Sequence, residues 1–143
     1  MKRGLLVVLS MLMLSLMSCD NSTSPVEVPH PDNWEFIFES VFGVTRVNGV
    51  KLGAGAVLPT PLVIPATCPE GRAVTDIRSG AFRNLGLTAV TIPEGITWIG
   101  PWAFADNNLT SVTIPNSVTS MDATPFDPGV TLIGWDREWG NRP

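Results

Sequence analysis

Few side chains in this 143-residue sequence could support catalysis. Its single histidine, His30, lies between two prolines and lacks the convergent partners that a general base or a metal site requires. Two carboxylate pairs, Glu35 with Glu39 and Asp136 with Glu138, could be mistaken for a glycosidase pair, which needs a cleft and a raised pKa in one member. Both pairs fit solvated positions, one on a strand face and one in a tail. We therefore expect no enzyme activity, no cofactor and no metal site.

The N-terminal segment has the features of a targeting signal. Lys2 and Arg3 precede an apolar run, Leu5–Met17, that would cover about 20 Å as a helix. This length falls short of the roughly 30 Å hydrocarbon core of a bilayer. Residues 1–18 are therefore predicted to be a secretory signal peptide and not a membrane-spanning helix.

Cys19 follows this segment in a specific context. The tetrapeptide Leu16-Met17-Ser18-Cys19 resembles the lipobox of bacterial lipoproteins. The resemblance implies that the Cys19 thiol is diacylglycerated, that the signal is cleaved before Cys19, and that the new amino terminus is acylated, with palmitate among the expected fatty acids. Membrane lipid is then the first partner, because each buried CH₂ contributes about 0.8 kcal/mol and several chains share one residue. Cys68 would have no intrachain partner, so it is either a small, partly buried loop residue or a reactive or intermolecular thiol.

The charge of the chain excludes one class of partner. The whole chain has a net charge of −4, and loss of Lys2 and Arg3 with the signal leaves 7 basic against 13 acidic side chains, a net charge near −6. Nucleic-acid binding needs clustered Lys and Arg against the phosphates. We therefore exclude nucleic acid as a ligand.

A 22-residue repeat organises the second half of the chain. Residues 74–95 and 96–117 align without gaps and share ten identical positions of 22. The longest shared stretches are Ala81-Phe82 with Ala103-Phe104, Leu87-Thr88 with Leu109-Thr110, and Val90–Pro93 with Val112–Pro115. A third, degraded copy begins at Val118 and keeps Phe126 in the same register.

The repeated positions predict a coil that contains a strand and a bulky plug. In the stretch Leu-Thr-x-Val-Thr-Ile-Pro, Val and Ile alternate with Thr, which gives a strand with one apolar face, and the proline ends it. The phenylalanine of each Ala-Phe pair fills the opposite side of the coil. Because one coil cannot bury this face alone, successive coils must stack, with parallel strands at about 4.8 Å.

These residues resemble the BspA-like leucine-rich repeat, which is found in many bacterial surface proteins. The match includes Val63–Pro65 and Gly71–Ile77 as a first coil and covers roughly residues 62–133. The asparagine between repeats appears as Asn108, while Gly86 stands at the matching site of the previous copy. The resemblance implies a mainly β fold, a short right-handed leucine-rich-repeat solenoid. The third copy departs from the pattern, with Asp122 and Pro125 where the second copy has Gly100 and Ala103, and we interpret it as a closing cap.

The remaining residues must complete this small solenoid, since two clear repeats are few. Trp34, Phe36 and Phe38 alternate with other residues and predict a strand with one aromatic face. Asn48-Gly49 favours a hairpin turn, and we expect the hairpin to pair with or cover the first coil. The predicted layout is a signal peptide at 1–18, a flexible tether at 19–33, a β cap at 34–61, the solenoid at 62–133 with a last strand at Val130–Ile133, and a C-terminal tail at 134–143.

Tryptophan and threonine side chains are the candidate ligand contacts. Trp98 and Trp102 occupy positions where the first copy has an aspartate and a glycine. On a solenoid these positions face outward, and exposed tryptophan is typical of binding sites. The alternative is that both pack beneath the N-terminal hairpin. Thr91 and Thr113 are expected to lie on the same sheet face as these anchors.

The sequence thus indicates a non-catalytic lipoprotein of the bacterial cell envelope, lipid-anchored at the outer surface. Its expected partner is an extracellular or envelope protein or glycan, and the BspA-like resemblance implies adhesion to host or other cells. The alternative is a structural lipoprotein that faces the periplasm and scaffolds an envelope complex. Asp20 favours this alternative, since aspartate after the acylated cysteine retains lipoproteins in the inner membrane of some enteric-type bacteria.

Overall fold

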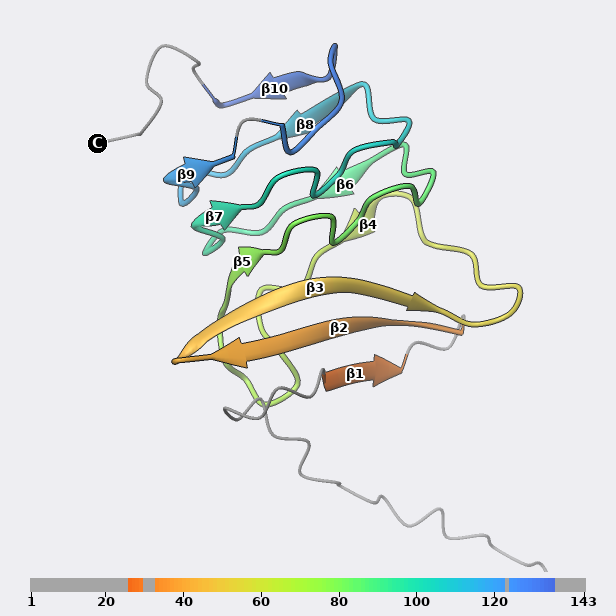
Figure 1. The fold of residues 1–143 in the computed structure, drawn as a ribbon, viewed down its shortest axis with the longest axis vertical. Helices are drawn as coiled ribbons and strands as arrows, with labels where there is room; N and C mark the ends of the chain where they lie inside the picture. The colour runs from red at the N-terminus through yellow and green to blue at the C-terminus, as the bar shows by residue number, and fades with distance from the viewer. Residues whose placement is uncertain (1–25, 30–32, 123, 136–143) are drawn as a thin grey trace, which may run out of the picture.

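The computed structural model describes residues 26–29, 33–122 and 124–135 (Figure 1). In these ranges the chain forms ten strands: β1 Val26–Pro29, β2 Trp34–Val41, β3 Val44–Leu52, β4 Leu62–Val63, β5 Val74–Ile77, β6 Val90–Thr91, β7 Trp98–Ile99, β8 Ser111–Thr113, β9 Ser120–Met121 and β10 Thr131–Ile133. Among the described residues, no helix has the length and apolarity needed to cross a membrane. The mainly β class predicted from the sequence is confirmed.

The strands lie on two sides of a stack of coils (Figure 1). One side is a six-stranded sheet in the order β1-β2-β3-β5-β7-β9, in which β1, β2 and β3 pair antiparallel and the other neighbours pair parallel. The other side has two parallel pairs, β4 with β6 and β8 with β10. The chain therefore forms the predicted solenoid of parallel strands, and β10 is the last strand expected at Val130–Ile133.

The 22-residue period of the sequence is the spacing between stacked coils. Along the six-stranded sheet, Ile77 pairs with Ile99 and Ile99 pairs with Met121. On the other side Leu62 pairs with Val90, because a longer turn separates β4 from β5 in the first coil. The period of 22 is thus kept where β5, β7 and β9 stack. It changes on the other side, both at the first coil's turn and at the last coil, where Val112 pairs with Leu132, 20 positions later.

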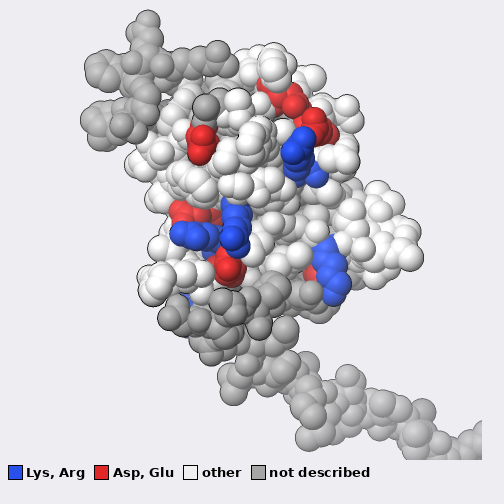
Figure 2. Space-filling model, viewed as in Figure 1, with Lys and Arg blue, Asp and Glu red and all other residues white. Residues whose placement is uncertain are grey.

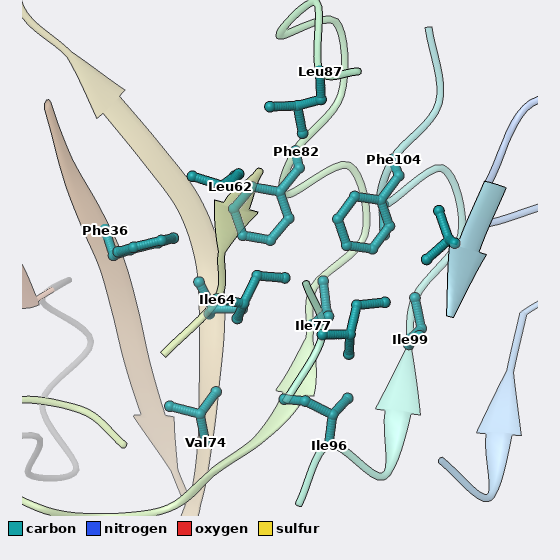
Figure 3. Close-up of a cluster of buried hydrophobic side chains, with 14 of the residues drawn as sticks. Phe36, Leu62, Ile64, Val74, Ile77, Phe82, Leu87, Ile96, Ile99 and Phe104 are labelled. Carbon is teal, nitrogen blue, oxygen red and sulfur yellow. The ribbon is translucent and has the colours of Figure 1, made fainter. Parts of the chain in front are cut away.

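A ladder of phenylalanines fills the interior of the stack (Figure 3). Ring centroids of Phe82 and Phe104 are 5.3 Å apart, and those of Phe104 and Phe126 are 5.1 Å apart, with interplanar angles of 13° and 4°. Phe36 extends the ladder with an edge contact to Phe82 at 6.3 Å. The predicted plug is confirmed, including Phe126 in the degraded third copy. The large, fully buried aliphatic residues of the core are Val47, Leu62, Ile64, Val74, Ile77, Ile96, Ile99, Val112 and Val118.

A β-hairpin covers the first coil, as the sequence predicts. On β2 the side chains of Trp34, Phe36 and Phe38 are buried, while those between them are half-buried. β3 pairs in parallel with β5, so the hairpin protects the edge that the first coil would otherwise expose. The aromatic face of the hairpin thereby becomes part of the core.

The predicted position of the hairpin turn is wrong. The chain turns at Phe42-Gly43, where Val41 pairs with Val44, and Asn48-Gly49 lies inside β3. Phe42 has a φ of 51° and Gly43 a φ of 83°, the positive values that a two-residue hairpin turn requires. Phenylalanine is an unusual residue at such a φ, so the sequence offered Asn48-Gly49 as the better turn.

Asn48-Gly49 instead forms a β-bulge. Ile37 is opposite Gly49 and Phe38 is opposite Val47, which leaves Asn48 as an extra residue in β3. The bulge brings the backbone of β3 close to the turn of the first coil. A glycine is required there because of this approach, and not because the chain reverses.

Gly49→Ala is expected to lower the free energy of unfolding by about 1–3 kcal/mol, because the new methyl group would clash with the backbone of the first coil. Gly49 has a φ of 142°, and a Cβ at this position would lie 2.4 Å from the carbonyl oxygen of Ala81. Gly43→Ala is the matched control: its φ is also positive, but its Cβ would meet no atom within 4 Å. Urea denaturation of both variants measures the difference, and equal losses would contradict the close approach.

The prediction of a flexible tether over residues 19–33 is wrong for residues 26–29. These residues form β1, which pairs antiparallel with β2, with Val26 opposite Phe38 and Pro29 opposite Glu35. The physical reason is that β2 has a free backbone edge on the side away from β3, and an extended segment satisfies its hydrogen bonds. The folded part of the chain therefore starts before the predicted cap.

Candidate binding surface

The four predicted contact residues do not share one face. Thr91 in β6 and Thr113 in β8 are exposed on the side of the two parallel pairs, whereas Trp98 lies in β7 of the six-stranded sheet (Figure 1). Trp102 follows β7 in the turn of the same coil. The expectation that the threonines flank the tryptophans on one sheet face is therefore wrong, because each coil places these segments on different sides.

Trp98 is half-buried and packs close to the backbone of its own coil. A Cβ on Gly100 would lie 2.8 Å from Cη2 of the Trp98 ring, so glycine at position 100 makes room for that ring. The β7 strand that carries Trp98 is separated from hairpin strand β3 by β5. Trp98 is thus a packing residue of the second coil more than an exposed anchor.

Trp102 is exposed and held in an unusual backbone conformation. Its side chain is 54% exposed and its φ is 55°. Gly80, one period earlier, has a φ of 66°, so the turn requires a left-handed residue that is usually glycine. Hydrogen bonds hold the Trp102 backbone: its N–H donates to the Thr124 carbonyl at 2.8 Å, and its carbonyl accepts from the Ala105 N–H at 3.2 Å. Strain of this kind concentrates at functional sites.

A groove of about 470 Å³ lies beside Trp102, between the turns of the stacked coils. Its polar side chains come from three successive coils, and its floor includes the buried residues Ala105 and Phe126. We refer to the polar and aromatic lining residues as the Trp102 groove: Arg83, Trp102, Asp106, Thr124 and Asp127.

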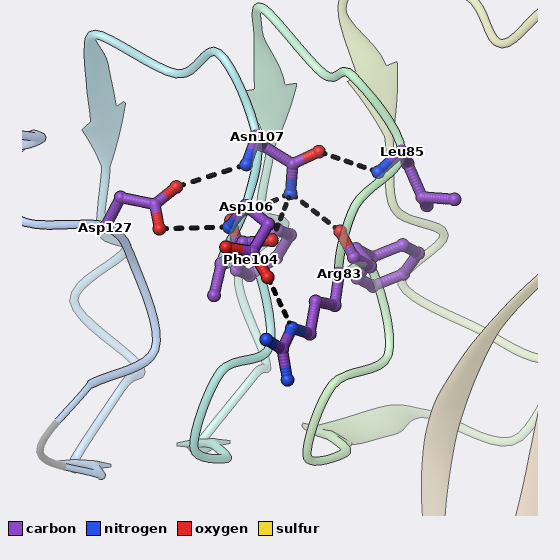
Figure 4. A network of polar contacts seen from close by, with 8 residues as sticks. Arg83, Leu85, Phe104, Asp106, Asn107 and Asp127 are labelled. Atoms are coloured by element: carbon purple, nitrogen blue, oxygen red, sulfur yellow. Dashed lines mark hydrogen bonds and ion pairs between the residues drawn. The ribbon is translucent and has the colours of Figure 1, made fainter.

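Ion pairs and hydrogen bonds fix the polar wall of this groove (Figure 4). Nε of Arg83 donates to Oδ2 of Asp106 at 2.6 Å, and both side chains are about half exposed. The carboxylate of Asp127 accepts from the backbone N–H of Asp106 at 2.9 Å and of Asn107 at 3.1 Å. The wall therefore presents one guanidinium and two carboxylates in a fixed arrangement.

Asn107 supports this wall from inside, and the sequence did not identify it. Its Nδ2 donates to the carbonyls of Phe82, Phe104 and Ala105 at 2.7, 2.8 and 3.2 Å. Its Oδ1 accepts from the N–H group of Leu85 at 3.1 Å (Figure 4) and from that of Leu87 at 3.0 Å. Asn108, the asparagine predicted between repeats, is exposed. The adjacent pair Asn107-Asn108 indicated an asparagine at this turn, but aligning the two repeats did not show which of the two side chains points inward.

Other charged residues form ion pairs on the six-stranded sheet. Glu39 pairs with Arg78, Arg46 pairs with Asp76 at 3.3 Å, and Glu35 pairs with Lys51 at 3.0 Å. In Figure 2 positive and negative side chains accordingly lie next to one another in small groups. Glu35 and Glu39, which the sequence offered as a carboxylate pair, each pair with a cation: Glu35 with Lys51 on the neighbouring strand β3, and Glu39 with Arg78, directly after β5.

Of the other residues discussed from the sequence, Cys68 is buried, and four lie outside the described part of the chain. Cys68 is 3% exposed, and its Sγ donates to Oε2 of Glu70 at 3.1 Å. Of its two predicted roles, the structure matches the buried loop residue. Cys19, His30, Asp136 and Glu138 lie outside the described residues.

Comparisons with known proteins agree with this architecture. A family model described as "BspA type Leucine rich repeat region (6 copies)" matches residues 66–131. A solved leucine-rich repeat protein from Bacteroides capillosus ATCC 29799 is similar in structure, with a TM-score of 0.51 and 25% sequence identity over 76% of this chain and 99% of the other. No curated protein sequence matches the chain.

Proposed function

Residues 66–131 are a leucine-rich repeat region of the BspA type, and from this premise we propose that the chain is a lipid-anchored recognition protein of the bacterial cell envelope. It binds a protein or glycan outside the membrane, including ligands on host or other cells. The role is non-catalytic, since binding is the general role of leucine-rich repeat modules. The residues proposed to contact the ligand are Trp102 first, with Thr91 and Thr113 on a separate exposed row.

The observation that carries this proposal is the exposed Trp102 on a rigid turn. Large exposed aromatic side chains are typical of binding hot spots, and they are most effective where the backbone is already ordered. Trp102 meets both conditions, because inter-coil hydrogen bonds hold its backbone and its ring is 54% exposed. The second coil has a tryptophan at the position where the first coil has Gly80, and a positive φ is less favourable for tryptophan than for glycine. A binding role would explain why this conformational cost is retained.

The lipid anchor of the proposal rests on the residues around Cys19. Leu16–Cys19 resembles a lipobox, and a bilayer anchor with several acyl chains would hold the protein at the membrane. The ordered strand β1 starts at Val26, so only residues 20–25 would separate the acylated cysteine from the folded part. Such a short connection would keep the solenoid near the membrane surface.

Cys19→Ala is expected to abolish anchoring. The wild-type chain, expressed in its bacterial host with radiolabelled palmitate, should incorporate label and partition into the detergent phase, because the acyl chains add apolar surface. The variant should lose both properties. Cys68→Ala is the matched control, since it removes the other cysteine and leaves labelling intact. Unlabelled wild-type protein would contradict the anchor.

Protease shaving of intact cells tests the outer-surface location. Loss of the immunoblot band from intact cells is the expected result, with a lysed-cell sample as the control for protease access. Protection in intact cells together with loss after lysis would instead support the periplasm-facing scaffold that Asp20 favours. The surface recognition function would then be wrong.

A further inference from the structure

We propose that the Trp102 groove binds a pyranose ring of a neutral glycan, an inference that rests on the recognition function above and names its ligand class. The ring would stack on the indole of Trp102, and its hydroxyl groups would bind Arg83, Asp106 and Asp127. The argument rests on the shape of the groove, the chemistry of its wall and the isolation of Trp102 from other exposed apolar residues.

The indole of Trp102 offers the flat apolar surface that a pyranose needs. One face of a pyranose presents C–H groups, which pack on aromatic rings and leave the hydroxyls at the ring edge to point outward. An exposed aromatic ring with a fixed backbone provides this contact without further ordering of the chain. Trp102 has such a backbone, with its N–H and carbonyl both hydrogen-bonded within the stack.

The wall of the groove matches hydroxyl groups, which both donate and accept hydrogen bonds. The carboxylates of Asp106 and Asp127 can accept from hydroxyls, and the guanidinium of Arg83 can donate to them. Among the described residues, the Arg83–Asp106 ion pair engages only Nε and Oδ2, so the terminal nitrogens of Arg83 and the second oxygen of Asp106 remain available. Figure 4 shows the terminal nitrogens of Arg83 directed away from the Asn107 network.

The size of the groove suits a short segment of glycan. Its volume of about 470 Å³ is within the range of small-ligand sites, roughly 300–1,000 Å³. Its floor is buried protein, with Ala105 and Phe126 each less than a tenth exposed. A ring on Trp102 would therefore lie against packed coils and not over a mobile loop.

Charge and surroundings favour a neutral glycan over other ligands. Two carboxylates against one guanidinium repel acidic sugars, and Arg83 repels a cationic peptide side chain over the same ring. A protein partner would bury about 800 Å² on each side around several apolar anchors. Within the described part of the chain, the other large exposed apolar residues lie elsewhere: Phe42 at the hairpin turn, Leu52 at the end of β3, Val57 in the loop after it, Val63 in β4 and Ile133 in β10.

The test uses the full lipidated chain in nanodiscs of neutral lipid. These are applied to an array of immobilised neutral oligosaccharides that contain glucose, galactose or N-acetylglucosamine, together with acidic uronic-acid oligosaccharides and an oligolysine peptide. The dissociation constant for the best soluble oligosaccharide is then measured by calorimetry. Array density also compensates for the weak binding of a single small site.

Trp102→Gly is the decisive variant, because it restores the residue that the first coil has at this position. The variant is expected to weaken neutral-glycan binding at least about tenfold, while its thermal midpoint stays close to that of the wild type. Asp106→Asn and Arg83→Gln should each weaken binding by about three- to tenfold. Phe42→Asn, which also removes an exposed aromatic residue at positive φ, should leave binding unchanged.

Three results would overturn the inference. The first is that no neutral oligosaccharide binds the wild-type chain. The second is that neutral glycans bind Trp102→Gly as tightly as the wild type. The third is that oligolysine binds instead and is lost in Trp102→Gly, which would assign the groove to a basic peptide. None of these results decides whether the chain is a surface recognition protein, because protease shaving and whole-cell adhesion test that function separately.

Discussion

Phe104→Ala is expected to lower the free energy of unfolding by about 4–5 kcal/mol, the largest effect of any single change that we predict. Phe104 is fully buried, and its ring stacks on Phe82 at 5.3 Å and on Phe126 at 5.1 Å. The variant loses the burial of a large side chain and both aromatic pairs, each of which contributes about 0.5–1.5 kcal/mol. It also leaves a cavity in the middle coil, so the coils on both sides lose their contact.

Urea denaturation followed by circular dichroism measures this effect. Phe104→Leu should lose about 1–1.5 kcal/mol, because leucine still fills most of the space. Phe42→Ala is the matched surface control, since the same substitution at a side chain that is 90% exposed should change stability by about 0.5 kcal/mol or less. A loss below about 2 kcal/mol for Phe104→Ala would show that the phenylalanine ladder does not hold the coils together.

Asn107→Ala is expected to lower the free energy of unfolding by about 3–4 kcal/mol, since each backbone group left without a partner costs about 1–3 kcal/mol and water replaces only some of the lost bonds. The side chain of Asn107 bonds the N–H groups of Leu85 and Leu87 and carbonyls that include those of Phe82 and Phe104. It therefore joins the second coil to the first through hydrogen bonds to backbone groups of both coils.

The neighbouring Asn108→Ala is the control for this prediction. Asn108 is exposed, so its replacement should change the free energy of unfolding by about 0.5 kcal/mol or less. Equal losses for the two variants would mean that the hydrogen-bond network around Asn107 contributes nothing to stability. Amide hydrogen exchange at Leu85 and Leu87 provides a local readout, because both N–H groups should exchange faster in Asn107→Ala.

The repeat pattern was sufficient to predict the architecture. Ten identities in 22 positions, with strand alternation and one phenylalanine in each copy, determine which side chains point inward. Because no coil can bury that face alone, stacking with parallel strands follows from local chemistry. The third copy shows the strength of this argument, since Phe126 keeps its place in the ladder although most of its neighbours differ.

Other features depended on the path of the backbone in three dimensions. Asn48-Gly49 is a hairpin signal by composition, but it forms a bulge that brings the backbone of β3 close to the turn at Ala81. Asn107 and Asn108 lie in an irregular turn, where side chains do not alternate between two faces as they do in a strand. The sequence therefore does not predict which of the two points inward. Likewise, only the edge of β2 explains why residues 26–29 form a strand.

The sequence by itself determined the period, the apolar faces and the plug, because these depend on residue spacing along one coil. It also identified Trp102 as a tryptophan in the place of a glycine. Only the tertiary structure decided that Arg83, Asp106 and Asp127 share a groove with Trp102 and that Thr91 and Thr113 do not. The physical reason is that contacts between coils join residues about 20 positions apart, whereas residues within one coil separate to different sides of the stack.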